Sequence, residues 1–197
     1  RLAGERFAHL LEREAHLPLL MIASPRKALL VGVSHPETFT AAAAHGVETQ
    51  TIDPHARLMD ILAAQAAASW ESTRADVRHS TASLRGYLTG RDERYDLILL
   101  ELPAPAHGPA AAFQTTRESF RLLRDHMSPG SLLVLRIPRP YFATTLIRIV
   151  KTAQEAFPQV GILDIPGCLM VIASEAPVDA TAAYTARGAG VGQRRLG

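Results

Sequence analysis

Short apolar runs recur along the chain and alternate with segments whose apolar residues have helical spacing. An apolar run bounded by turn residues is typical of a strand that is buried on both faces of a sheet. We expect strands at residues 27–33, 47–53, 77–81, 95–102 and 131–137. We expect helices at residues 36–46, 54–68, 82–90, 115–127 and 142–157. Strand and helix alternate five times, which predicts an α/β fold with a mainly parallel sheet covered by helices on both faces.

Different patterns mark the two ends of the chain. Residues 4–16 have the spacing of an amphipathic helix, which we expect to stop before Pro18. Residues 160–165 and 168–174 are apolar runs on either side of a Pro-Gly turn, and they predict a closing antiparallel hairpin. From Ala176 onward Ala, Gly and Arg dominate, which predicts a flexible tail.

These patterns divide the chain into three parts. The 197 residues suit one sizeable domain and are few for two. The parts are an N-terminal helix and lead-in segment at residues 1–24, one α/β domain at residues 25–175, and the tail at residues 176–197.

Composition and charge exclude several classes of protein. Hydrophobic residues make up 47% and charged residues 20%, as in ordinary globular proteins. The formal net charge is +2 and no Lys/Arg run is interleaved with aromatic residues, so we expect no nucleic-acid partner. No apolar stretch approaches the ~18 residues of a membrane-spanning helix. Since the chain begins at Arg1 rather than at a methionine, an upstream membrane region in a longer protein stays open.

Cysteine and histidine usage bear on compartment and metal binding. Cys168 is the only cysteine, so no internal disulfide can form, and a reducing compartment is the natural expectation. We therefore expect a cytoplasmic protein, or the cytoplasmic domain of a membrane protein. The eight histidines show no metal-site spacing, and we expect no metal site.

Ligands of such sheets bind at the carboxyl ends of the strands, so the turn after the first strand is a candidate site. Many cofactor-binding domains have several glycines there, whereas this chain has only Gly32. Ser34 and Glu37 instead form a Ser-x-x-Glu capping box ahead of the next helix. We favour the cap over a ligand-binding loop because the capping pattern is complete and the glycine pattern is not.

The end of the second predicted strand offers an acidic residue. Asp53 follows Gly32 by about 20 residues, the spacing at which a carboxylate contacts a cofactor ribose. Asp53 also directly precedes Pro54, so it is equally suited to be the N-cap of the following helix. Both interpretations stay open.

Several segments together resemble the spermidine synthases, which are polyamine aminopropyltransferases. They are EAHLPL, PRKALLVG, YDLILLELPAPAHGPAAAF and TTRESFRLLRDHMSPG, and the likeness runs from about Leu10 to Ser174. The sequence of these segments most resembles spermidine-synthase-like domains that some bacterial proteins carry beside a membrane-embedded region. The small N-terminal β-domain of the soluble enzymes is missing from this chain. The resemblance implies a Rossmann-like, S-adenosylmethionine-dependent methyltransferase-type fold with a C-terminal antiparallel hairpin, and a homodimer.

The resemblance also places residues at a pocket for decarboxylated S-adenosylmethionine or S-adenosylmethionine. The cofactor positions are Gly32, Val33, Ser34, Asp53, Ser83 and Leu84. The family has a glycine-rich turn where this chain has Val33 and Ser34, and a ribose-binding glutamate where it has Thr51. Ser83 stands at the position of the adenine-binding aspartate, and there we favour a surface or capping hydroxyl over a ligand contact.

The fourth strand carries the candidate catalytic residue, Glu101. In the family, acids of a D-S-S-D-P segment orient the substrate amine and accept its proton. Glu101 keeps one carboxylate, displaced by the ~1.5 Å of an extra methylene, and misplacement of about 1 Å can cost about 100-fold in rate. Ala104 stands where the second acid would be. Upstream, Leu10 and Leu11 replace a Tyr-Gln pair of the pocket, while Glu12 matches the family's glutamate.

Four sets of residues in this chain differ from those of the spermidine synthases: the turn glycines, the ribose-binding acid, the adenine-binding acid and the amine-binding acids. We therefore expect a domain related to polyamine biosynthesis that has diverged and lost catalysis. Two alternatives stay open. One is an active aminopropyl- or methyltransferase that uses Glu101 with an altered nucleoside pocket. The other is a non-catalytic sensor that binds a nucleoside or a polyamine.

Overall fold

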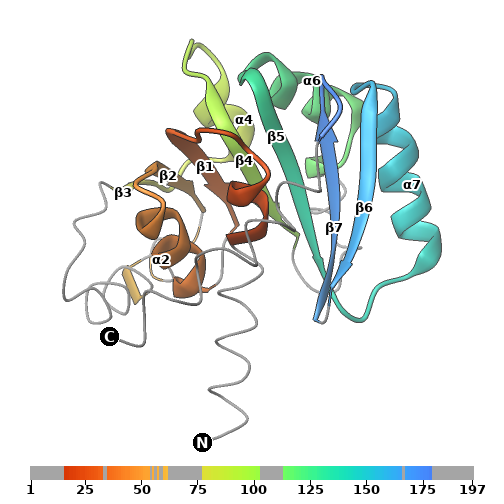
Figure 1. Ribbon diagram of the computed structural model, residues 1–197, viewed down its shortest axis with the longest axis horizontal. Coiled ribbons are helices and arrows are strands. Elements are labelled where there is room, and N and C mark those ends of the chain that lie inside the picture. Colours follow the sequence, from red (N-terminus) through yellow and green to blue (C-terminus); the bar gives the residue numbers. More distant parts are fainter. Residues whose placement is uncertain are drawn as a thin grey trace, which may run out of the picture.

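A computed structural model describes residues 16–32, 35–53, 55, 57, 60–61, 77–102, 113–165 and 167–178. The described residues contain one seven-stranded sheet in the order β3-β2-β1-β4-β5-β7-β6 (Figure 1). The strands are β1 (Lys27–Val31), β2 (Glu48–Ile52), β3 (Val77–Ser80), β4 (Tyr95–Glu101), β5 (Met127–Pro138), β6 (Gln159–Ile165) and β7 (Cys168–Ser174). The helices are α2 (Pro36–Ala44), α4 (Leu84–Leu88), α6 (Arg117–Asp125) and α7 (Ala143–Gln154).

The sheet has the direction of pairing that the sequence predicts. Strands β1 to β5 pair in parallel, while β7 is antiparallel to both β5 and β6. The order reverses between β1 and β4, because the chain builds outward from β1 in one direction and then returns to its other side. This confirms the mainly parallel α/β sheet and the closing hairpin.

Two apolar clusters lie on the two faces of the sheet. Successive side chains of a strand point to opposite faces, so Leu29 joins the cluster beneath α4, α6 and α7, while Leu30 joins the cluster beneath α2. Figure 1 shows α2 on one face and the other three helices on the opposite face. Cys168 is buried within the α2 side, as expected for an unreactive structural thiol.

Two of the differences from the predicted boundaries change the course of the chain. Residues 16–20 are helical, so the first helix does not stop before Pro18. Leu19 is 2% exposed, and its packing in the α2-side cluster favours helical backbone around the proline. The rest of the predicted helix at residues 4–16, apart from its last residue, lies outside the described residues.

The second difference is in β5. We expected Ser128, Pro129 and Gly130 to form a turn that closes the preceding helix. Instead β5 already begins at Met127, which pairs with Tyr95, and the next paired residue is Leu132. The three turn-forming residues therefore bulge out of the strand, and a proline is compatible with a strand at such a bulge. The predicted tail lies outside the described residues from position 179 onward.

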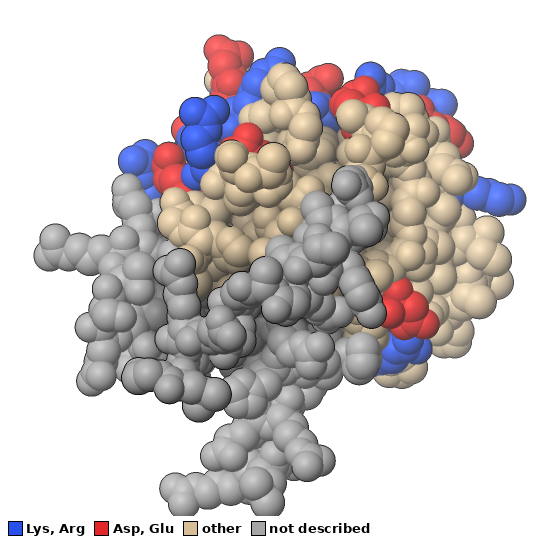
Figure 2. Space-filling view, in the orientation of Figure 1, with Lys and Arg blue, Asp and Glu red and all other residues tan. Residues whose placement is uncertain are grey.

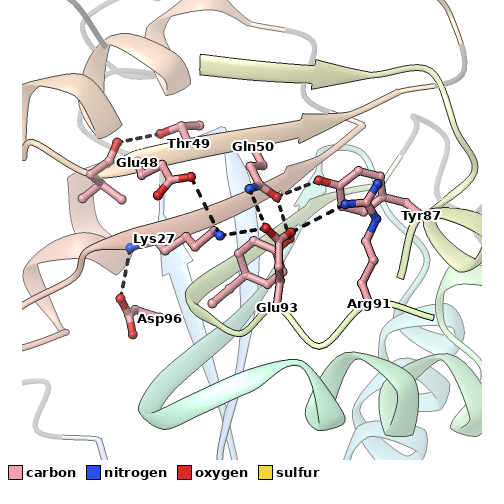
Figure 3. Close-up of polar contacts among 10 residues, drawn as sticks. Lys27, Glu48, Thr49, Gln50, Tyr87, Arg91, Glu93 and Asp96 are labelled. Atoms are coloured by element: carbon pink, nitrogen blue, oxygen red, sulfur yellow. Dashed lines mark hydrogen bonds and ion pairs between the residues drawn. The ribbon is translucent and has the colours of Figure 1, made fainter. Parts of the chain in front are cut away.

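A polar network joins β1, β2 and β4 near their N-terminal ends (Figure 3). Glu93 accepts from Lys27 Nζ at 3.1 Å and from Gln50 Nε2 at 3.5 Å. Burial raises the pKa of Glu93, but hydrogen bonds from Lys27, Tyr95 and Gln50 outweigh it and leave the pKa below its usual value. Tyr87 and Tyr95 both contact Gln50 Oε1 at 2.6 Å, which satisfies the amide of a residue that is 2% exposed.

The turn after β1 brings two strands into unusually close contact. Gly32 has φ +67°, and its amide donates to the carbonyl of Ile52 at 3.0 Å. A Cβ at this position would lie 2.9 Å from the carbonyl oxygen of Glu101 in β4. The glycine is therefore required by the packing of the strand ends, whether or not a ligand binds there.

Helix α2 ends against the first described helical segment through a pair of histidines. His16 Nδ1 lies 2.9 Å from His45 Nε2, so at least one ring must be neutral to accept the proton. Burial lowers the pKa of His45, and the neighbouring His16 lowers it further.

We predict that Gly32→Ala destabilises the protein more than Gly90→Ala does. Both glycines have positive φ, +67° and +78°, and both substitutions incur the left-handed backbone penalty of about 1–2 kcal/mol. Only Gly32 also has the carbonyl of Glu101 against its Cβ position, since nothing lies within 4 Å of a Cβ at Gly90. Chemical denaturation should show an additional loss of about 1–3 kcal/mol for Gly32→Ala, the usual cost of overpacking. Equal losses would show that β4 does not approach this turn so closely.

We also predict that acidification weakens the histidine junction. The pKa of His45 is lower in the folded protein than its ordinary value of 6.5, which applies to the unfolded chain. Its contribution to stability is therefore present above pH 6.5 and is lost as the pH falls below 6.5 and through the lowered folded pKa. Thermal unfolding between pH 7.5 and 5 should show a smaller loss for His45→Gln than for the wild type. An identical pH dependence in the two proteins would contradict this role for His45.

Candidate functional site

The carboxyl edge of the sheet carries a buried charged cluster. Glu101 ends β4 and lies directly opposite Arg136 of β5 in the parallel pairing. Arg136 Nη1 donates to Glu101 Oε1 at 2.8 Å, and the two residues are 8% and 6% exposed. His35, just before α2, places Nδ1 3.3 Å from the same carboxylate oxygen and is more exposed.

The physical reason for this cluster is the cost of isolated buried charge. A carboxylate or guanidinium taken out of water without a partner costs several kcal/mol, so each requires the other. The pairing also orients the carboxylate, because Oε1 is held toward β5 by Arg136. The candidate catalytic residue is therefore present at the expected edge, and its carboxylate is engaged by a fixed cation of the same protein.

The position of the family's ribose acid is also occupied by an internal contact. Thr51 of β2 is 2% exposed and lies opposite His79 in the pairing with β3. Its Oγ1 lies 3.0 Å from His79 Nδ1. The Thr51 hydroxyl is therefore already engaged within the chain.

Asp53 is positioned at the end of β2 by backbone pairing. Its amide donates to the carbonyl of Ser80 at 3.1 Å, and its side chain is largely buried. Asp53 Oδ1 accepts from the amide of His55 at 2.7 Å and lies 2.9 Å from His55 Nδ1. Acceptance from the amide two residues ahead is the contact that an N-cap makes, so the geometry fits the capping interpretation; ribose binding by Asp53 stays a prediction.

Ser83 and Leu84 begin α4. Ser83 is the N-cap, and its Oγ accepts from the amide of Gly86 at 3.2 Å, as the capping interpretation expects. Leu84 is 6% exposed and packs in the cluster beneath α4, α6 and α7. Contacts of these two residues with an adenine ring stay predictions.

Part of the predicted site lies outside the described residues. This applies to Val33 and Ser34, and to Ala104 in the loop after β4. The side chain of Glu37 is likewise not described, so the predicted capping box stays a prediction. The structure therefore brings together Gly32 and Glu101 at the carboxyl edge, with Asp53 at the end of the adjacent strand β2.

Sequence reasoning missed the partners of these residues, above all Arg136. A signal was available, because Arg136 interrupts the apolar run SLLVLRI, and a charged residue in a buried strand needs a counter-charge. Glu101 ends the neighbouring strand of the predicted sheet. His35 and His79 carried no comparable signal, since their partners are set by the register of three strands and by the start of α2.

Two searches of the described residues bear on other kinds of site. They contain no group of three or more His, Cys, Asp or Glu side chains that could hold a metal ion. Among the helices that the structure describes, none is long and apolar enough to cross a membrane.

Comparison with known proteins shows the fold but no close relative. No protein-family model matches the sequence, and no curated protein matches it by sequence. A spermidine synthase in complex with the transition-state analogue AdoDATO superposes with a TM-score of 0.73 at 13% identity, covering 88% of this chain and 63% of the other. Spermidine synthase from Thermotoga maritima gives a TM-score of 0.71 at 14% identity, covering 88% and 62%.

A methyltransferase matches over a larger share of its length. Human methyltransferase-like protein 13 in complex with SAH gives a TM-score of 0.71 at 14% identity, covering 95% of this chain and 96% of the other. This chain thus spans less than two thirds of the spermidine synthases but nearly all of that methyltransferase chain. At these identities the likeness shows the fold alone, which is the Rossmann-like fold of S-adenosylmethionine-dependent methyltransferases and spermidine synthases.

Proposed function

We propose that this chain is a diverged, non-catalytic domain built on the fold of spermidine synthases and S-adenosylmethionine-dependent methyltransferases. The observation that carries the proposal is the buried ion pair between Glu101 and Arg136. In an aminopropyltransferase the corresponding carboxylate would orient a substrate ammonium. Here a guanidinium of the same chain already neutralises it.

The charge of the cluster disfavours a polyamine. An arginine does not lose its proton in proteins, so Arg136 stays a cation. An ammonium that approached Glu101 would meet this cation 2.8 Å from the carboxylate oxygen, and the attraction of the carboxylate would be offset by repulsion. A polyamine substrate would have to break the ion pair and separate the buried Arg136 from Glu101.

The nucleoside side of the edge supports the same proposal. Thr51 contacts His79, Asp53 contacts the amide of His55, and Ser83 caps α4. Three positions that the family resemblance places at the cofactor thus have partners within this chain: Thr51, Asp53 and Ser83. Internal contacts of this kind stabilise the strand ends without a ligand.

A second candidate is a domain that still binds an S-adenosylmethionine-type nucleoside, as a methyltransferase or as a sensor. The observation that favours it is the share of each neighbour's chain that this chain matches. The chain matches nearly the whole of a methyltransferase chain solved with SAH, but only about three fifths of the spermidine synthases. If a ligand binds this edge, that match favours a nucleoside over a polyamine.

Calorimetric titration separates these proposals. The full chain is titrated with decarboxylated S-adenosylmethionine, S-adenosylmethionine, methylthioadenosine and putrescine, with a spermidine synthase as a control for the ligand preparations. The non-catalytic proposal predicts no binding heat up to millimolar ligand. Micromolar binding of S-adenosylmethionine alone would favour the second candidate. Micromolar binding of the decarboxylated cofactor, followed by putrescine turnover that Glu101→Gln abolishes, would overturn the proposal in favour of an active aminopropyltransferase.

The ion pair itself is tested by a double-mutant comparison. Arg136→Met leaves Glu101 buried without its cation, and loss of one partner of a buried pair costs about 3–5 kcal/mol. Glu101→Leu combined with Arg136→Met removes both charges and should be more stable than Arg136→Met alone, as measured by chemical denaturation. If the double variant is at least as destabilised as Arg136→Met, the pair is not the structural element that we propose.

A further inference from the structure

Strand β6 leaves one edge of the sheet open. It is the last strand in the sheet order, and within the described part of the chain no strand pairs with its outer side. None of its seven residues is buried, whereas all seven residues of its neighbour β7 are buried. Its outer backbone amides and carbonyls therefore form an open edge that a further strand could pair with.

The composition of β6 does not protect this edge. Proteins usually block an exposed edge with lysine, proline or an inward-pointing charge. The strand sequence QVGILDI has neither lysine nor proline, and its one charged residue, Asp164, forms an ion pair with Arg139. At its centre Ile162 is 53% exposed, one of few large apolar side chains with that exposure among the residues that the structure describes.

Helix α7 extends this apolar edge. Figure 1 shows α7 beside β6 at this end of the sheet. Leu146 and Val150 of α7 pack, partly buried, against the same cluster as Val160 of β6. Ile147 follows on the same flank of the helix and is 53% exposed. By the rise per residue, Ile147 lies ~10 Å before the last residue of α7, and Ile162 lies ~10 Å after the first residue of β6.

The surface over this end carries little charge. In Figure 2 the area over β7 and β6 is largely uncharged, and charged groups lie toward its ends. Beside it, a groove over the α2-side face is lined by apolar residues that include Met21, Ile172 and Val178. Gly161 lies in that groove, with nothing within 4 Å of its Cβ position. An apolar, open strand edge next to an apolar groove is typical of a protein–protein contact surface.

The strand is complementary to a second copy of itself. In an antiparallel pair related by a two-fold axis at Ile162, this residue lies opposite its own counterpart. Asp164 then lies opposite Val160, so the two carboxylates do not face each other. Leu163 lies opposite Gly161, where the missing side chain leaves space. The two α7 helices come to the same side of the continued sheet, with the Ile147 flanks toward each other.

From this geometry we propose that two copies of the chain form a symmetric dimer through the β6–α7 edge, with β6 pairing antiparallel to β6. One isologous contact uses the same surface on both copies and closes the assembly at two. The proposal goes beyond the proposed function and does not depend on it, because the β6 edge is remote in sheet order from β1 and β2. Dimer formation and ligand binding can therefore be scored separately.

The first test is the molar mass of the full chain across concentration, by light scattering and sedimentation. The expected result is a reversible monomer–dimer equilibrium that stops at twice the chain mass. Ile162→Lys places two lysines opposite each other at the two-fold axis, and it should shift the dissociation constant upward at least tenfold. Since Ile162 is 53% exposed, the variant should keep the wild-type thermal unfolding temperature within a few degrees.

Ile61→Lys is the matched control, because Ile61 is 55% exposed and far along the chain from β6. It should dimerise as the wild type does. A wild type that stays monomeric at several hundred micromolar overturns the proposal. So does a dimer that Ile162→Lys leaves intact, or one that Ile61→Lys disrupts equally.

A second variant tests the register. Ile162→Cys places two thiols opposite each other, at the Cβ separation of about 4.5–5.5 Å of a directly opposed antiparallel pair. A short bifunctional thiol reagent should link this variant into covalent dimers. The wild type, whose Cys168 is buried, and Ile61→Cys should not be linked. Equal linking of Ile61→Cys and Ile162→Cys would overturn the proposed pairing.

Discussion

Among the described residues, the ion pair between Glu101 and Arg136 is the contact that most constrains the carboxyl edge of this sheet. Glu101 follows the apolar run at residues 97–100 of β4, and Arg136 follows the apolar run at residues 132–135 of β5. Removing either partner of such a buried pair is costly. A shift of one strand by a single residue would move a charge to the wrong face of the sheet. The pair thus specifies the alignment of β4 with β5.

Polar side chains also connect the strands at the opposite end of the sheet, there through a hydrogen-bonded network. There Lys27, Gln50 and Glu93 connect β1, β2 and the segment before β4. Burial raises the pKa of Tyr95, and the nearby Tyr87 and Glu93 raise it further, so the Tyr95 hydroxyl stays protonated. Apolar packing between these two ends holds the strands together, while the polar groups define which residues face each other.

Periodicity was enough to predict the five parallel strands and the hairpin, because strands buried on both faces leave long apolar runs in the sequence. The helix predicted at residues 54–68 lies mostly outside the described residues. Periodicity was not enough at Pro129 and Gly130, where turn residues occupy a bulge inside β5 and the pairing of Tyr95 with Met127 continues the sheet past them. The partners at the candidate site were hidden for a related reason. Contacts such as Thr51 with His79 depend on register between strands, and register is a property of the sheet rather than of any one segment.

Gly32 shows why a single residue that matches a ligand-binding motif is weak evidence for a ligand. Its positive φ and the approach of the Glu101 carbonyl are consequences of how β1 and β4 end side by side. Those consequences do not depend on the residues that follow Gly32, because the Cβ of an alanine would collide with the backbone of β4. A glycine at this position is therefore evidence for the fold, whereas evidence for the function must come from the polar contacts around it. In this chain those contacts join the protein to itself.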